Sequence, residues 1–191
     1  MVNVKGGLVL KIKDLTTVAL MTAILLILGV IPGIPLGFIP VPIVLQNIGV
    51  LLAAILLGPK RGTLSILLLL LLAAVGLPVL SGGRGGLPVL IGPTGGYLLG
   101  WLLTPLLVHL GLSLLKKKQH TSLQLLICWL AGVLCVDLIG SLWLTFQSNM
   151  PLIPALLSNL VFLPGDTLKV ILAFTMAKTL RVHHLFQKAS H

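Results

Sequence analysis

Six long apolar runs, separated by short breaks rich in proline, glycine or basic residues, constrain this chain more than any other feature of its sequence. The runs lie near 14–31, 44–58, 62–77, 93–115, 121–147 and 164–184. A helix needs roughly 20 apolar residues to cross a hydrocarbon core about 30 Å thick, and 57% of the 191 residues are hydrophobic while only 8% are charged. The sequence therefore predicts an all-α integral membrane protein, with six transmembrane helices in a single membrane domain spanning 1–191.

The basic residues indicate how these helices are oriented. They cluster before the first run, between the second and third, between the fourth and fifth, and at the end of the sixth. The clustered residues are Lys5, Lys11, Lys13, Lys60, Arg61, Lys116, Lys117, Lys118, Lys178, Arg181 and Lys188. The remaining connections carry only Arg84. Because cytoplasmic connections are enriched in lysine and arginine, we expect both termini to be cytoplasmic and the connections after runs one, three and five to lie outside.

The outer connection between the third and fourth runs is rich in glycine, at 81–86 and 92–97. Irregular backbone at membrane depth is tolerated only where protein buries it or where it lines a water-filled cavity. The segment therefore predicts the wall or lid of a binding site. Within it, Arg84 is either a solvated loop charge or a cation that closes over an anionic ligand group. Ser81 and Tyr97 flank the glycines, and a tyrosine there is also typical of the membrane interface.

Asp166 and Lys169 stand three residues apart at the outer end of the last apolar run, so they share one face of a helix. One interpretation is a capping aspartate with a local ion pair. The other is a binding site in which Asp166 accepts hydrogen bonds from a ligand and Lys169 donates to one. Ionisable residues inside membrane segments usually face the protein interior or a cavity, which favours the second interpretation. A site with both signs suits a small polar metabolite better than a metal ion.

Three other features leave alternatives open. Gln46, near the outer end of the second run, either satisfies loop carbonyls or binds a ligand's polar edge. Asp137 lies among apolar neighbours, where a structural hydrogen bond near Ser141 is favoured over a proton relay. Ala19 and Ala23 form a small-xxx-small pair, which allows another helix to approach closely.

The sequence lacks the motifs of several enzyme classes and metal sites. The chain has no G-x-x-x-x-G-K-[ST] sequence for nucleotide hydrolysis, and no Ser/His/Asp arrangement, carboxylate pair or His/Cys cluster presents itself. We therefore expect no enzymatic activity, no cofactor and no metal site. No convincing inverted repeat with two broken helices appears, which counts against a self-contained secondary transporter.

Taken together, these residues resemble the BioY family, the biotin-specific substrate-binding (S) components of energy-coupling factor (ECF) transporters. The resemblance covers nearly the whole chain, and its most specific parts are the run 92–97 and the pair of Asp166 with Lys169. The other matching pieces are Ile39-Pro40-Val41-Pro42 with Gln46, Leu57-Gly58-Pro59-Lys60-Arg61-Gly62, Gly76-Leu77-Pro78-Val79 and Gly82-Gly83-Arg84-Gly85-Gly86.

The resemblance implies the six-helix ECF S-component fold, in a multi-pass protein of a prokaryotic cell membrane. It implies that biotin is bound at the outer face, for ATP-driven import by a transmembrane coupling subunit and two cytosolic ATPases. The biotin-binding residues implied are Asp166, Lys169, Ser81, Arg84, Gln46 and Tyr97, and the implied docking residues are Ala19 and Ala23. Two alternatives remain: an S component for another vitamin, and a stand-alone facilitator or proton-coupled transporter that uses Asp137 or Asp166.

Overall fold

Helices form the main secondary structure of the part of the chain that the structure describes. The structure is a computed structural model and describes residues 12–37, 39–115 and 120–189, with side chains to residue 180. Its helices are α1 (Ile12–Val30), α2 (Gln46–Ala74), α3 (Leu87–Ile91), α4 (Gly95–Ser113), α5 (Thr121–Trp129), the π-helical turn η1 (Leu130–Leu134), α6 (Cys135–Ser148), α7 (Leu152–Ser158), the 3₁₀ turn η2 (Asn159–Val161) and α8 (Phe162–Ala189). Two isolated β-bridges join Ile34 with Ile43 and Leu80 with Arg84.

Within these residues, five continuous helical stretches are long and apolar enough to cross a membrane. They are Ile12–Val30, Gln46–Ala74, Gly95–Ser113, Thr121–Ser148 and Leu152–Leu180. The predicted all-α membrane class is thus confirmed. The predicted count of six is not reproduced directly, because the runs expected at 44–58 and 62–77 are joined in α2. The cytoplasmic position of both termini stays a prediction.

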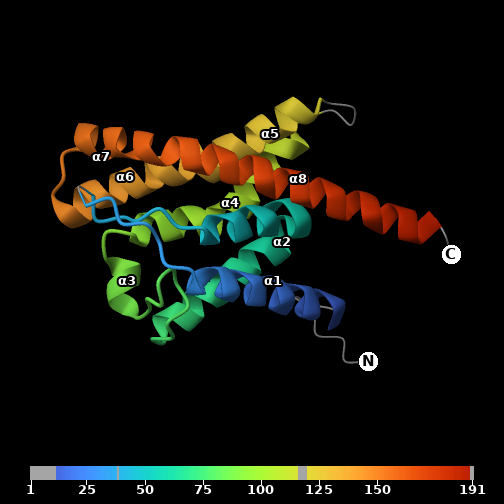
Figure 1. Cartoon of the computed structure of the whole chain (residues 1–191), viewed down its shortest axis with the longest axis horizontal. Coiled ribbons are helices and arrows are strands. Elements are labelled where there is room, and N and C mark those ends of the chain that lie inside the picture. The colour runs from blue at the N-terminus through green and yellow to red at the C-terminus, as the bar shows by residue number, and fades with distance from the viewer. Residues whose placement is uncertain (1–11, 38, 116–119, 190–191) are drawn as a thin grey trace, which may run out of the picture.

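The helix α2 folds back on itself at Gly58. That residue has φ 73° and ψ −169°, far from helical values, and Pro59 follows it. A straight helix of 29 residues would be about 43 Å long, yet the Gln46 side chain at its start bonds to Val79 just beyond its end. Figure 1 shows the chain doubling back within α2. The segments 46–57 and 59–74 are therefore two antiparallel helices joined by a glycine turn.

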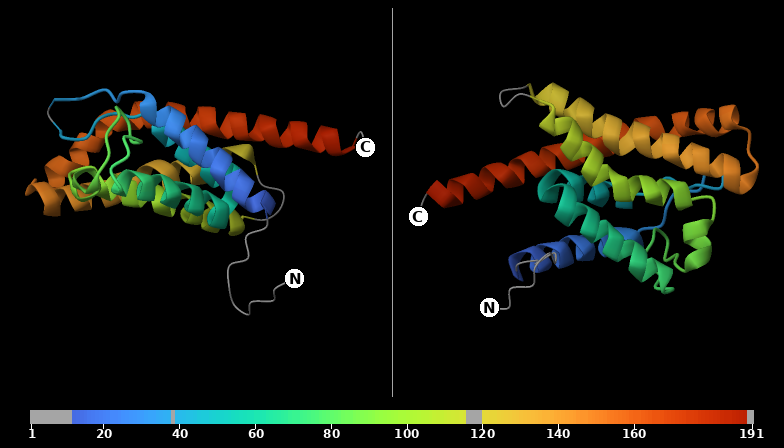
Figure 2. Two further views of the ribbon diagram at one scale, coloured as in Figure 1. Left: turned by 90° about the horizontal axis from the view of Figure 1, so that it is seen from below. Right: turned by 180° about the vertical axis from the view of Figure 1, so that it is seen from behind.

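The bundle is organised around α4, which packs between α2 and α6, while α8 packs on α2 and α5. Glycines allow α4 and α6 to approach closely: a Cβ atom on Gly100 would collide with Val136, and one on Gly140 with the Tyr97 ring. The helix α1 lies along the second half of α2, as Figure 2 shows. There the buried Thr22 hydroxyl donates to the Ser65 carbonyl oxygen at 3.2 Å.

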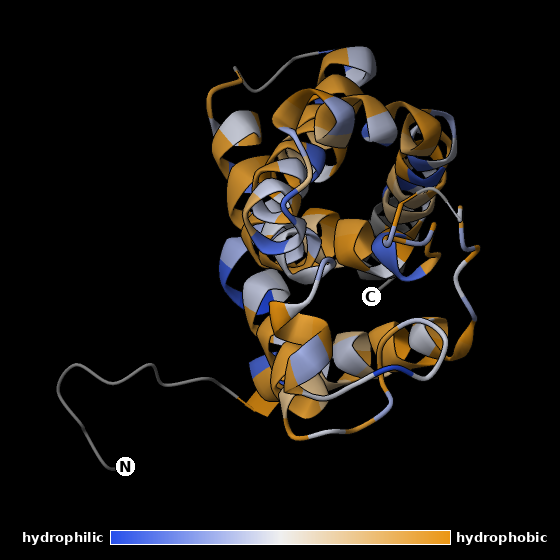
Figure 3. Ribbon diagram, turned by 90° about the vertical axis from the view of Figure 1, so that its left-hand side faces the viewer, coloured by the Kyte–Doolittle hydropathy of each residue, from blue (hydrophilic) through white to orange (hydrophobic). Residues whose placement is uncertain are grey.

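Polar and apolar surfaces are distributed as a membrane requires. Hydrophobic residues make up much of the helices in Figure 3, and each spanning helix exposes large aliphatic side chains. The start of α1, the bend of α2, the start of α5 and the far part of α8 lie at one end of the bundle, and α3 and α7 at the other (Figure 1). At the first end Arg61 pairs with Asp14 at 2.5 Å, and the Lys178 ammonium donates to the Thr121 hydroxyl. This clustering agrees with the predicted alternation of basic connections.

The outer connections contain more helix than expected, and the capping interpretation of Asp166 is wrong. The segment 148–163, expected to be a connection, is largely helical, since α7 and η2 lead directly into α8. Because α8 begins at Phe162, Asp166 lies past its first turn and is not an N-cap residue. A short helix, α3, also interrupts the glycine-rich segment.

Replacing Gly58 by alanine tests the turn of α2. The combination of positive φ with an extended ψ is essentially restricted to glycine, and a side chain there costs about 1–3 kcal/mol. We expect the apparent melting temperature in detergent to fall, by roughly 2–4 °C for each kcal/mol. Gly165→Ala is the matched control, since its Cβ would meet open space on a helix without positive φ. Alanine there should leave stability equal or slightly higher. An unchanged melting temperature for Gly58→Ala would contradict the turn.

Candidate functional site

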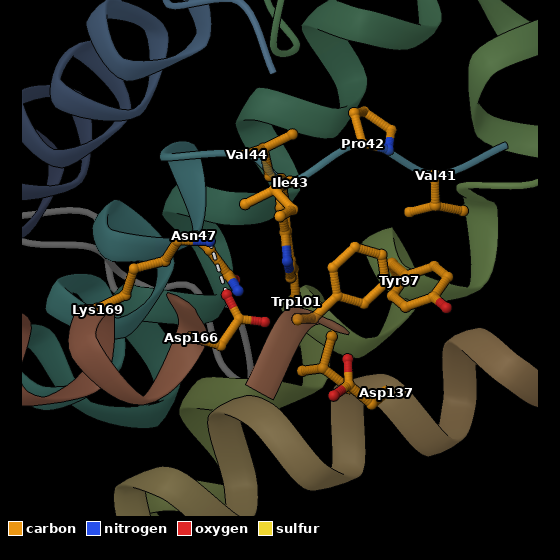
Figure 4. Close-up of a pocket in the computed structure, with 12 residues that line it drawn as sticks. Val41, Pro42, Ile43, Val44, Asn47, Tyr97, Trp101, Asp137, Asp166 and Lys169 are labelled. Atoms are coloured by element: carbon orange, nitrogen blue, oxygen red, sulfur yellow. Dashed lines mark hydrogen bonds and ion pairs between the residues drawn. The ribbon is translucent and has the colours of Figure 1, made fainter. Parts of the chain in front are cut away.

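Two small adjoining cavities lie near the end of the bundle that carries α3 and α7. They have volumes of about 50 and 40 Å³. Both cavities are lined by Val41, Pro42, Val44, Tyr97 and Trp101. The first also has Asp166, Lys169, Asn47 and Asp137 in its wall, and Figure 4 shows these side chains. The second is bounded by Gln46, Ser81 and Arg84. The structure therefore brings all six predicted ligand-binding residues around one composite space, which we call the paired cavity.

The ion pair in the first part of the paired cavity comes from a single turn of α8. The Lys169 ammonium donates to Asp166 Oδ1 at 2.6 Å, and the two residues are only 5% and 7% exposed. Buried charges are expensive unless they are paired, so each residue stabilises the other. Since an ammonium has three donors and a carboxylate accepts through two oxygens, both can also bind a ligand.

The second part of the paired cavity is walled by the glycine-rich segment. Leu80 and Arg84 exchange two backbone hydrogen bonds, and the tight turn between them needs positive φ at Gly82 and Gly83. Arg84 Nε also donates to the Ser81 carbonyl oxygen at 3.1 Å. The turn thus fixes a half-buried guanidinium at the cavity.

Gln46 is a structural bridge as well as a cavity residue. Its Nε2 donates to the carbonyl oxygens of Leu25 and Val79, at 2.9 and 3.0 Å. Ser81 makes a similar link, since its hydroxyl donates to the Ile31 carbonyl oxygen at 2.8 Å. The end of α1 is therefore joined to both α2 and the glycine-rich segment. The side-chain oxygen of Gln46, which is fully buried, has no hydrogen-bond partner.

Aromatic rings form the apolar wall that the two parts of the paired cavity share. Tyr97 and Trp101 are one helical turn apart on α4 and are both buried. The Tyr97 ring meets Phe162 edge to face, with centroids 6.2 Å apart. Its hydroxyl donates to Asn159 Oδ1 at 2.8 Å, so in this arrangement the ring and not the hydroxyl is offered to a ligand.

Asn159 connects Tyr97 with α6. Its Nδ2 donates to the Asp137 carbonyl oxygen at 3.0 Å and to the Ser141 hydroxyl oxygen at 2.6 Å. Thus the backbone of Asp137 takes part in this structural network. Its carboxylate instead lies in the wall of the first part of the paired cavity, below Tyr97 and Trp101 in Figure 4.

Sequence reasoning did not assign Asn47, Trp101 or Asp137 to the site. Trp101 lies four residues after Tyr97 and therefore on the same helical face, a signal that could have found it. Asn47 is 7% exposed, and its side-chain oxygen has no partner. Its position beside Gln46 did not reveal which of the two amides reaches the first part of the paired cavity.

The predicted docking pair lies away from the paired cavity. Ala19 and Ala23 are both exposed on α1, on one stripe of the helix. Among the residues that the structure describes, no group of three or more His, Cys, Asp and Glu side chains gathers as metal ligands would.

The paired cavity therefore offers an ion pair and several acceptors in its first part, a guanidinium in its second part, and aromatic rings between them. The model of the BioY family matches residues 2–187. This chain belongs to the BioY family. Biotin transporter BioY of Lactococcus lactis subsp. cremoris (strain MG1363) is 53% identical over 173 residues, which cover 90% of this chain and 92% of that protein.

Other BioY proteins and a solved structure agree with this family membership. Biotin transporter BioY of Rhizobium etli is 38% identical and covers 89% of this chain and 94% of its own length. A crystal structure of the S-component for biotin from an ECF-type ABC transporter superimposes with a TM-score of 0.85 at 52% identity. The match covers 89% of this chain and 91% of that one. The fold predicted from the family resemblance is thus that of a solved S component.

Gln46→Leu tests the bridging role of this amide. The change keeps the side chain's approximate size but removes the donor to two carbonyl oxygens, and a buried unsatisfied group costs about 1–3 kcal/mol. We expect a lower melting temperature in detergent without any ligand. Gln147→Leu is the control, since Gln147 is exposed near the end of α6. Equal melting temperatures for the two variants would show that the bridge adds no stability.

Proposed function

We propose that this BioY protein is the biotin-binding S component of an ECF-type ABC transporter, and that it captures biotin at the outer face of the membrane. The observation that carries the proposal is the buried Asp166–Lys169 pair in the wall of a cavity. It is supported by relatives that are named biotin transporters and by the likeness to an S component for biotin.

The chemistry of biotin complements the paired cavity. Its ureido ring has two N–H donors and one carbonyl acceptor, its thiophane ring is apolar, and its tail ends in a carboxylate. Asp166 would accept from a ureido N–H and Lys169 would donate to the ureido carbonyl. The thiophane ring would pack on Tyr97 and Trp101. The tail would extend toward Ser81 and Arg84, where the guanidinium complements its charge; Gln46 borders this second part.

Binding requires the segment 31–45 to move. Pockets for small ligands are typically larger than about 300 Å³, whereas the two parts of the paired cavity measure about 50 and 40 Å³. Val41, Pro42 and Val44 border both parts, and apart from the bridge between Ile34 and Ile43 the described residues of this segment, 31–37 and 39–45, form no helix or strand. Outward displacement of the segment would enlarge both parts together and open the site to the outside.

The membrane arrangement that fits this function has six crossings, with both termini in the cytoplasm of a prokaryotic cell. The antiparallel halves of α2 would each cross the membrane, which turns the five continuous stretches into six spans. The whole chain, 1–191, would form one membrane domain. The protein would have no catalytic residues, cofactor or metal of its own.

Transport would need partners that hydrolyse ATP, a transmembrane coupling subunit and two cytosolic ATPases. The proposed docking surface is the exposed stripe of Ala19 and Ala23 on α1, where small side chains would let a partner helix approach closely. A stand-alone transporter remains the alternative from a different class, and biotin uptake by this chain alone in vesicles would favour it. An S component for another vitamin would bind that vitamin in preference to biotin.

Titration of biotin into the purified, biotin-depleted protein tests the proposed ligand, with desthiobiotin and thiamine titrated alongside. We expect one-to-one binding of biotin and no signal from thiamine.

Asp166→Asn should weaken biotin binding at least about tenfold, because it removes a charge-assisted acceptor and leaves Lys169 unpaired. Asp14→Asn, in the ion pair at the opposite end, is the matched control and should retain the affinity. If Asp166→Asn binds biotin with the wild-type affinity, this carboxylate does not contact the ligand.

Ala19→Trp tests the docking surface. A large ring on the stripe should prevent close helix contact while leaving biotin affinity unchanged, because Ala19 is remote from the paired cavity. Co-purification of the coupling subunit with the tagged variant measures assembly. Leu142→Trp, at an exposed position on α6, controls for the general effect of a membrane-facing tryptophan. Normal recovery of the coupling subunit with Ala19→Trp would contradict the assignment.

A further inference from the structure

Buried hydrogen-bond acceptors without partners gather around the paired cavity. Among the residues that the structure describes, four side-chain atoms are buried and lack a partner, and three of them belong to cavity residues. These three are Gln46 Oε1, Asn47 Oδ1 and Asp137 Oδ2. Each is an acceptor, and a buried acceptor without a donor is costly. The site therefore has an excess of acceptors that a ligand with several N–H groups would satisfy.

Asp137 stands out because it is a carboxylic acid and its residue is only 5% exposed. The polar network beside it supplies no donor to Asp137 Oδ2. The Tyr97 hydroxyl donates to Asn159 Oδ1, and the Ser141 hydroxyl donates to the Ala155 carbonyl oxygen at 3.2 Å. Asn159 Nδ2 is committed to the Asp137 carbonyl oxygen and to Ser141. The network thus anchors the backbone of Asp137 while Oδ2 remains unpaired.

Asp137 and Asp166 reach the first part of the paired cavity from different helices. Asp137 comes from the first turn of α6, which follows the π-helical turn η1, and Asp166 comes from α8. Figure 4 shows Asp166 beside Asn47, with Asp137 on a separate wall. The two carboxylates also differ in their surroundings, because Asp166 is paired with Lys169 while Asp137 Oδ2 has no partner.

We propose that Asp137 is a specificity-determining ligand contact, which accepts the second N–H of a cyclic urea while Asp166 accepts the first. This inference rests on the proposed function and adds to it a residue and a reason for selectivity. The two N–H groups of a cyclic urea point away from opposite sides of one ring, so acceptors on two walls are needed to satisfy both. A ring that lacks the N–H facing Asp137 would leave Asp137 Oδ2 buried without a donor.

The test combines a conservative variant with two altered ligands. Biotin and its two mono-N-methyl ureido derivatives are titrated into wild-type protein, Asp137→Asn and the control Asp14→Asn. We expect Asp137→Asn to bind biotin about tenfold to a hundredfold more weakly, since the amide replaces one oxygen acceptor by an NH2 donor that cannot accept the ligand's N–H. Methylation of the N–H that faces Asp137 should weaken binding to the wild type and to Asp14→Asn. The same methylation should weaken binding to Asp137→Asn by a factor that is at least about tenfold smaller than for the wild type.

Comparing the three ligands across the variants distinguishes a direct contact of Asp137 with the ligand from a role of Asp137 in the fold alone. The bulk of the methyl group is the same in each protein, so the difference between the proteins isolates the hydrogen bond. If Asp137→Asn weakens all three ligands by one common factor, Asp137 supports the fold without touching the ligand and the proposal fails. It also fails if Asp137→Asn binds biotin as the wild type does. Absence of biotin binding by the wild type would overturn the proposed function, and this contact with it.

A measurement on wild-type protein alone covers the case in which Asp137→Asn does not fold. With an acceptor for each N–H, both mono-N-methyl derivatives must bind at least about tenfold more weakly than biotin. A derivative that binds as tightly as biotin would show that one N–H has no acceptor, which overturns the role of Asp137. Melting of each variant without ligand reports whether it is folded.

Discussion

The buried ion pair of Asp166 and Lys169 is the interaction on which the site depends. Two charges within an apolar bundle are tolerated because they neutralise each other at 2.6 Å. Since both come from one turn of α8, the pair needs no third residue from another helix to balance it. It nevertheless restricts the rotation of α8, because turning the helix would expose both charges to lipid. The pair therefore orients α8 and supplies the polar end of the paired cavity at the same time.

The opposite wall is held by hydrogen bonds between side chains and distant backbone. Gln46 joins the end of α1 to the segment after α2, and Ser81 joins the glycine-rich turn to Ile31. These side chains donate hydrogen bonds to backbone carbonyl oxygens that water cannot reach, and they thereby stabilise the irregular segments of the backbone. As a result α1 is attached to the paired cavity on one side, while its stripe of Ala19 and Ala23 stays exposed on the other.

Local features could be predicted from the sequence, and long-range ones could not. The break at Gly58 and the shared face of Asp166 and Lys169 depend on neighbours along the chain, and both are present. The partners of Asn159 are 18 to 62 residues away, and they depend on how each helix is rotated. The π-helical turn η1 changes that rotation just before α6, which carries Asp137 in its first turn, and no pattern in the sequence marked it. The same uncertainty explains why Asn47 was not distinguished from Gln46.

The arrangement of charges makes the paired cavity directional. Its first part joins the Asp166–Lys169 pair with unpaired acceptors, while its second part offers the guanidinium of Arg84. A ligand with N–H donors at one end and an anionic group at the other satisfies both parts in one orientation only. Reversing it would bring its anion against Asn47 Oδ1 and Asp137 Oδ2 and leave both of these acceptors without donors, and both effects are costly. Selectivity then follows from the cost of mismatched buried groups, in addition to attraction for the correct ligand.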